Sequence, residues 1–202
     1  MNEKAKKSMV VGKADVNPKF KEMAERVHLK SRKPMAEFHL TNARLTSCQI
    51  KRLEDIGYFK APASKGHHLA YEGGLIEHSI NVVDRMLELG AFKNEESAYR
   101  VGMLHDLVKC KCYRQKDDGT FDYVQPPYPG HGVASVMIAH ELGISLTPVE
   151  MAAITWHMGA FGLGERELKE YHAAIRRFPR EIILTHAADH LASAFEEKGG
   201  EA

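Results

Sequence analysis

The 202-residue sequence predicts an all-α fold, a helical bundle of about six or seven helices with a small β-hairpin insertion. Apolar residues recur at spacings of three and four through most of the chain, which is the period of an amphipathic helix. The alternation that is typical of strands is confined to one short stretch, residues 111–125. With a hydrophobic content of 44%, a chain of this length can bury one sizeable core.

The N-terminal quarter of the chain predicts a tail followed by two helices. Residues 1–17 are rich in lysine and poor in apolar side chains, so we expect a flexible basic tail there. Residues 18–202 are expected to form a single helical domain. Its first helix begins at Pro18, after which apolar residues return every three or four positions. A second helix is expected over residues 41–56, with Gly57 as its C-terminal stop.

The middle of the chain predicts two helices and the hairpin. An ordered loop at residues 58–68 leads to a helix over residues 75–90, whose apolar positions follow a helical period. The next helix is expected over residues 98–108. Two short alternating strands follow within residues 111–125, and the Asp-Asp-Gly sequence at 117–119 is suited to the turn between them.

The C-terminal part of the chain predicts three further helices, over residues 131–142, 148–158 and 179–197. Pro148 suits the first turn of a helix, because the N–H that proline lacks has no helical partner at that position. Residues 159–164 are rich in glycine and predict a loop.

Composition excludes several classes of function. Lys and Arg total 28 and Asp and Glu total 27, and a net charge of +1 argues against a protein that coats nucleic acid or an anionic membrane. No apolar run approaches the length of about 18 residues that a membrane span needs. The N-terminus has no apolar segment of the kind found in secretory signals, and the chain contains neither a dinucleotide-binding fingerprint nor a P-loop.

The three cysteines predict free thiols in a reducing, cytoplasmic compartment. Their number is odd, so they do not suggest a disulfide framework. Cys110 and Cys112 form a Cys-x-Cys pair, but Cys48 alone cannot complete a second pair, which argues against a cysteine-based zinc site.

Histidine is the abnormal part of the composition, with 12 residues against one tryptophan. It is the commonest metal ligand in proteins and the side chain that titrates near neutral pH. Several histidines lie three or four residues from apolar side chains of the same predicted helix, a spacing that places them on its inner face. The residues directed inward in this way, from five predicted helices, are His78, His105, His131, His157 and Asp189.

A single histidine on an apolar helix face is usually a core residue with one hydrogen bond, so no one of these positions predicts a metal site. An aspartate on such a face is different, because a buried carboxylate needs a partner or a metal ion. His105 and Asp106 are adjacent and would diverge by about 100° on a helix, so both can reach one ion only at the helix edge. The set as a whole predicts a metal site.

The order His78, His105-Asp106, Asp189 resembles the signature of the HD superfamily of metal-dependent phosphohydrolases. The segment from Tyr71 to Ser79 is similar to the one that contains the first metal-binding histidine in that superfamily, and Leu104-His105-Asp106-Leu107-Val108-Lys109 is similar to its central motif. The resemblance spans about residues 41–197 and is strongest for small single-domain HD hydrolases of bacteria and bacteriophages. Further shared motifs are Phe59–Ser64, His131-Gly132, His157-Met158-Gly159 and Ala188-Asp189.

The resemblance implies an HD-type helical domain and a set of metal ligands. His78, His105, Asp106 and Asp189 would bind a first ion, and His131 and His157 match the additional histidines of two-metal members, with Asp106 then bridging the ions. Val108 replaces a glycine that many members have, which affects no ligand. This nitrogen and oxygen ligand set suits one or two divalent transition-metal ions, Mn, Fe, Zn, Ni or Co, better than Ca or Mg.

The function implied is hydrolysis of a phosphomonoester or phosphodiester of a nucleotide or short nucleic acid by metal-activated water. Asp106 and Lys109 are the candidate catalytic residues, and Lys109 lies one helical turn from the His-Asp pair. Candidate substrate-binding residues are Lys65, His67, His68, Lys109 and Arg114. The near-neutral charge favours a small phosphate substrate, and nucleic acid is the less favoured partner. The alternatives are an HD-type di-iron oxygenase and a non-catalytic nucleotide- or nucleic-acid-binding module.

Overall fold

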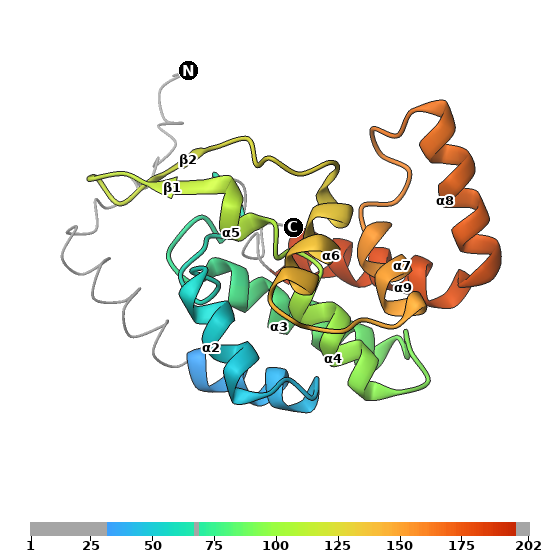
Figure 1. The fold of residues 1–202 in the computed structure, drawn as a ribbon, viewed down its shortest axis with the longest axis horizontal. Coiled ribbons are helices and arrows are strands. Elements are labelled where there is room, and N and C mark those ends of the chain that lie inside the picture. The colour runs from blue at the N-terminus through green and yellow to red at the C-terminus, as the bar shows by residue number, and fades with distance from the viewer. Residues whose placement is uncertain (1–31, 67–68, 197–202) are drawn as a thin grey trace, which may run out of the picture.

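The computed structural model describes residues 32–66 and 69–196 as a helical bundle with one small hairpin (Figure 1). The prediction of an all-α fold is therefore confirmed. The predicted tail at residues 1–17, the helix from Pro18, and His67 and His68 lie outside the described residues. After a helical segment at 32–42, the elements are α2 (Ser47–Asp55), α3 (Gly74–Glu88), α4 (Glu95–Leu104), α5 (Lys109–Cys112), β1 (Tyr113–Gln115), β2 (Phe121–Tyr123), α6 (His131–Glu141), α7 (Pro148–Thr155), α8 (Glu165–Arg177), α9 (Pro179–Leu191) and the π-helical turn η1 (Ala192–Glu196).

Helix α3 forms the centre of the bundle because its inner face is apolar along most of its length. Leu75, Ile76, Val82, Val83 and Met86 are fully buried there. Helices α4 and α9 pack against α3, while α6 and α9 both pack against α7. This arrangement brings helices that are distant in sequence side by side around one core.

The hairpin and α8 lie at opposite edges of the molecule in the view of Figure 1. Strands β1 and β2 pair antiparallel, which confirms the predicted hairpin. Helix α8 is absent from the predicted set of helices. It has no buried residue, and its half-buried positions Leu168, Tyr171 and Ile175 face the bundle at helical spacing, a weaker apolar pattern than that of a core helix.

One predicted helix, over residues 41–56, is wrong at its beginning. The preceding helical segment ends at residue 42, Arg44 adopts a positive φ of 58°, and a new helix begins after Thr46. A capping box explains the break, because the Thr46 Oγ1 accepts a bond from the Gln49 N–H while Gln49 Oε1 accepts one from the Thr46 N–H.

Three further helices end before their predicted boundaries. Helix α4 stops at Leu104 and not at 108, α7 at Thr155 and not at 158, and α9 gives way to η1 after Leu191. After α4 the backbone tightens into turns with bonds between residues three apart, such as Lys109 N–H to Asp106 C=O at 2.9 Å. His105, Asp106 and His157 therefore lie beyond helix ends and not within helices.

Two glycines allow neighbouring helices to approach closely. A Cβ on Gly102 of α4 would lie 2.5 Å from Val83 Cγ2 and 3.1 Å from the Val83 backbone of α3. A Cβ on Gly132 of α6 would lie 2.3 Å from the carbonyl oxygens of both Ile154 and Thr155 at the end of α7. Real Cβ atoms do not tolerate such distances, so these positions require glycine.

Replacement of Gly132 by alanine should therefore destabilise the protein. The new methyl group meets backbone atoms that cannot rotate away, and overpacking of this kind costs about 1–3 kcal/mol. Urea unfolding measures the free energy of unfolding. Gly66→Ala is the matched control, because a Cβ there meets nothing within 4 Å. Equal stability of the two variants would contradict the close contact between α6 and α7.

Candidate metal centre

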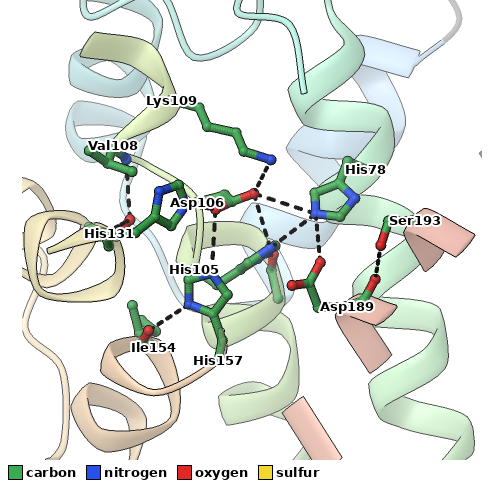
Figure 2. Close-up of polar contacts among 12 residues, drawn as sticks. His78, His105, Asp106, Val108, Lys109, His131, Ile154, His157, Asp189 and Ser193 are labelled. Carbon is green, nitrogen blue, oxygen red and sulfur yellow. Dashed lines mark hydrogen bonds and ion pairs between the residues drawn. The ribbon is translucent and has the colours of Figure 1, made fainter. Parts of the chain in front are cut away.

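Six of the predicted site residues converge on one point inside the bundle (Figure 2). They come from α3, from the turn after α4, from the first residue of α6, from the turn after α7 and from α9. Each supplies a nitrogen or oxygen atom. These atoms form three overlapping groups, and within each group they lie within 4.8 Å of one another: His78, His105 and Asp106; His105, His157 and Asp189; and Asp106, His131 and His157. The residues are His78, His105, Asp106, His131, His157 and Asp189.

Two of the imidazoles are oriented by backbone carbonyls one turn earlier in the chain. His105 Nδ1 lies 2.8 Å from the Gly102 oxygen, and His157 Nδ1 lies 2.7 Å from the Ile154 oxygen. A carbonyl oxygen can only accept a hydrogen bond, so Nδ1 is the protonated nitrogen in both rings. In its neutral form each ring therefore directs the lone pair of Nε2 into the cluster, as metal-ligating histidines do.

Asp106 lies at the centre of the cluster. Its Oδ2 atom is 3.5 Å from the Nε2 atoms of both His78 and His105. Its Oδ1 atom is 2.5 Å from His131 Nε2 and 3.5 Å from His157 Nε2. One carboxylate thus faces four imidazoles, two on each oxygen.

His78 links this central carboxylate to the second one. Its Nε2 atom lies 3.1 Å from His105 Nε2 and 3.2 Å from Asp189 Oδ1. Ser193 donates a hydrogen bond to the Asp189 backbone carbonyl at 2.7 Å, within the turn that follows α9.

The electrostatics of the cluster favour two ionised carboxylates. Burial raises the pKa of Asp106, but Lys109 and the neighbouring histidines outweigh burial and hold that pKa well below its usual range. Burial likewise raises the pKa of Asp189, and His78 reverses the shift and lowers it. Burial lowers the pKa of His105, so the form of that ring with a free lone pair is favoured. The lone pair of His105 and the negative oxygens of Asp106 and Asp189 are buried close together, and a cation between them would stabilise this arrangement.

The donor separations fit a transition-metal ion. Donor atoms about 2.0–2.2 Å from one ion lie about 2.8–3.6 Å apart in octahedral or tetrahedral arrangements, a range that includes the 3.1 and 3.2 Å measured around His78. His157 Nε2 is fully buried and has no hydrogen-bond partner among the described residues, which leaves a polar atom that an ion would satisfy. The cluster could therefore hold a metal ion.

Lys109 lies at the edge of the cluster, one turn after Asp106. Its Nζ atom is 2.5 Å from Asp106 Oδ2, and the side chain is largely buried. Burial lowers the pKa of Lys109, but Asp106 outweighs burial and raises it, so the ammonium group keeps its charge. The structure thus places a fixed cation beside the central carboxylate.

The other predicted substrate-binding residues are less closely tied to the cluster. Lys65 is exposed on the loop before α3, and Arg114 is exposed on β1 opposite Asp122. His186, one turn before Asp189 in α9, bonds through Nδ1 to the His157 carbonyl at 2.6 Å. That contact supports the turn that contains His157, and no motif in the sequence signals it.

Comparison with known proteins identifies the family. The model of the HD domain matches residues 75–194, which include all six residues of the cluster, and the chain belongs to this family. The chain is also similar to the dihydroneopterin 2′,3′-cyclic phosphate phosphodiesterase of Methanocaldococcus jannaschii, with 38% identity over 100 residues.

That match covers 46% of this chain and 39% of the archaeal protein, so the chain aligns with well under half of its relative. No solved structure matches the chain. None of the helices in the described part of the chain combines the length and apolar character that a membrane crossing requires.

Replacement of a cluster histidine should lower the metal content. After loading with Mn²⁺ or Zn²⁺ and desalting, the wild-type protein should retain one or two ions, and His105→Ala should retain at most about half as much, because it removes a donor from two of the three groups. Elemental mass spectrometry provides the measurement. His140→Ala, an exposed histidine of α6, is the control. Full metal retention by the His105 variant would show that the cluster is not the binding site.

The cysteines should behave as thiols that take no part in metal binding. Burial raises the pKa of Cys110 to about 12 and that of Cys112 to about 11, so both remain protonated at pH 8. Cys48 is exposed. Iodoacetamide at pH 8 should therefore modify Cys48 in the native protein and all three thiols only after unfolding, as mass spectrometry can measure. Rapid native labelling of Cys110 or Cys112 would contradict this prediction.

Proposed function

We propose that this protein is a metal-dependent phosphohydrolase that cleaves a phosphomonoester or phosphodiester of a nucleotide or short nucleic acid. The observation that supports this best is the convergence of four imidazole Nε2 atoms and two carboxylates on one buried point, with the ammonium group of Lys109 at its edge. The HD family membership and the phosphodiesterase name of the archaeal relative support the same reaction class.

The cluster divides into two ligand sets that share Asp106. The contacts that His78 makes support a first ion held by His78, His105, Asp106 and Asp189. The contacts of Asp106 Oδ1 support a second ion held by His131, His157 and Asp106. The nitrogen-rich ligands suit Mn, Fe, Zn, Ni or Co. Such an ion polarises a phosphoryl oxygen and lowers the pKa of a bound water, which supplies the nucleophile at neutral pH.

The chain's own residues then have distinct tasks. Asp106 holds the ligand sets together, since both of its oxygens face imidazoles. Lys109 gives one N–H to Asp106 and has two further donors, which can bind a non-bridging phosphate oxygen as charge develops on it. The most exposed ligand is His131, whose side chain is 32% accessible, so a substrate phosphate would enter from the His131 side.

A small phosphate compound is the proposed substrate, with nucleic acid the less favoured partner. The archaeal relative is named for a cyclic phosphate of a pterin, which is a small molecule. Lys65, His67, His68 and Arg114 stay candidates for additional phosphate contacts. A single HD-type domain over residues 18–202, a cytoplasmic location and membership of the bacterial and bacteriophage branch also stay predictions.

Hydrolysis by metal-loaded protein tests the proposal. Protein loaded with Mn²⁺, Co²⁺ or Ni²⁺ should release phosphate or a monoester from a panel of nucleoside monophosphates, cyclic nucleotides and short oligonucleotides. Asp106→Ala should lose about a thousandfold or more in kcat/KM, because it removes a ligand of both sets, and Lys109→Ala about a hundredfold. His140→Ala should retain wild-type activity.

Two outcomes would overturn the proposal. Undiminished hydrolysis by Asp106→Ala would place the reaction elsewhere. Turnover that requires dioxygen and two iron ions, with no hydrolysis under anaerobic conditions, would instead identify an HD-type oxygenase.

A further inference from the structure

The hairpin β1–β2 follows the metal cluster directly in the chain. Helix α5 begins with Lys109 and spans a single turn, so Tyr113, the first residue of β1, lies four residues beyond the lysine that contacts Asp106. Tyr113 caps the C-terminal end of α5 and already has the extended backbone of the strand, with φ −130° and ψ 138°. The hairpin therefore starts a single helical turn away from the lysine that contacts the central carboxylate.

One face of the hairpin is aromatic. Tyr113 pairs with Tyr123 and Gln115 with Phe121, and alternation along a strand places these four side chains on one face, with Arg114 and Asp122 on the other. Phe121 is buried and anchors the far end of the hairpin. Tyr113 is half-buried against the core, whereas Tyr123 is 51% exposed.

The two tyrosine rings form a corner open to solvent on the Tyr123 side. Their centroids lie 6.2 Å apart and their planes meet at 73°. The Tyr123 hydroxyl donates to Gln125 Oε1 at 3.0 Å, which orients the ring. An exposed aromatic ring held in one orientation is a suitable surface for stacking against a flat ligand.

Tyr113 is close to the charged groups of the cluster. Burial raises the pKa of Tyr113, Lys109 lowers it, and Asp106 raises it again, so both charges act on the phenol. Together with the four-residue separation between Tyr113 and Lys109, this places the start of the aromatic corner beside the residue proposed to bind the phosphate. Two other aromatic residues are already engaged: Trp156 packs on Tyr171 with centroids 5.6 Å apart, and Tyr128 donates to Glu141 at 3.0 Å.

We propose that Tyr113 and Tyr123 bind the planar heterocyclic ring of the substrate while its phosphate group lies at the metal cluster. The inference rests on the proposed phosphohydrolase function and narrows its substrate class to phosphate esters with an attached heteroaromatic ring. Ring-free sugar phosphates would contact the cluster and Lys109 but not the hairpin. Arg114, on the opposite face, would not contact the ring.

Paired substrates that differ only in the ring test this inference. The pairs are adenosine 2′,3′-cyclic phosphate with methyl riboside 2,3-cyclic phosphate, and adenosine monophosphate with ribose 5-phosphate. Tyr123→Ala should raise KM for the ring-bearing member about tenfold or more, as expected for a lost stacking contact, and leave kcat within twofold. The same variant should leave kcat/KM for the ring-free member unchanged.

Variants of neighbouring positions separate ring binding from a structural role. Tyr123→Phe should restore the KM for the ring-bearing substrate, and Asp122→Asn, on the same strand but the opposite face, should behave as wild type. Tyr113→Ala, like Tyr123→Ala, should raise KM for the ring-bearing substrates and leave kcat/KM for the ring-free substrates unchanged. Equal losses for ring-bearing and ring-free substrates would show that the tyrosines only support the fold near Lys109, and unchanged KM values would show that they do not bind the ring.

Equilibrium binding separates failure of this inference from failure of the proposed function. If the wild-type protein hydrolyses none of the four compounds, titration calorimetry with adenosine monophosphate and ribose 5-phosphate on Mn²⁺-loaded protein still compares the tyrosine variants. A ring-dependent affinity that Tyr123→Ala abolishes would support the inference. Equal affinities for the two compounds, or no effect of the variant, would overturn it.

Discussion

The buried carboxylate of Asp106, faced by four imidazoles and one ammonium group, is the constraint on which the arrangement of the bundle depends. A carboxylate that is 3% accessible must be surrounded by partners, and these partners come from α3, α5, α6 and the turns after α4 and α7. Their helices can meet around it only because Gly102 and Gly132 remove the Cβ atoms that would hold α3 from α4 and α6 from α7. The polar centre therefore depends on the close packing of these helices.

The polar cluster is not what stabilises the bundle. Taking charged groups out of water costs free energy that their mutual attraction barely offsets, so the stabilising contribution comes from the apolar faces, above all that of α3. A bound ion would change this balance, because any species that binds only the folded state adds its binding free energy to stability. The burial of apolar side chains thus offsets the cost of burying the charged cluster, and a bound cation would reduce that cost.

Much of this could be predicted from the sequence, and the failures have identifiable causes. The helical periodicity predicted the bundle, the alternating stretch at residues 111–125 predicted the hairpin, and the ordered His and Asp residues predicted the six residues that meet. The helix ends could not be placed, because apolar spacing continues through Leu107 and Val108 although the backbone turns after Leu104. That error affected the site: the sequence predicts that His105 and Asp106 diverge on a helix, whereas in the turn both reach the same centre. Helix α8 was missed because it buries no residue.

The backbone bonds to His105 and His157 determine how the site can change. Their acceptors are the main-chain carbonyls of Gly102 and Ile154, which every amino acid possesses, so no exchange of side chain alone can remove either acceptor. The groups that orient His105 and His157 would consequently not appear as shared side chains in an alignment of related sequences. The orientation of these two rings would change only if the C-terminal ends of α4 and α7 moved. Loops and surface residues can therefore vary while both rings keep their orientation.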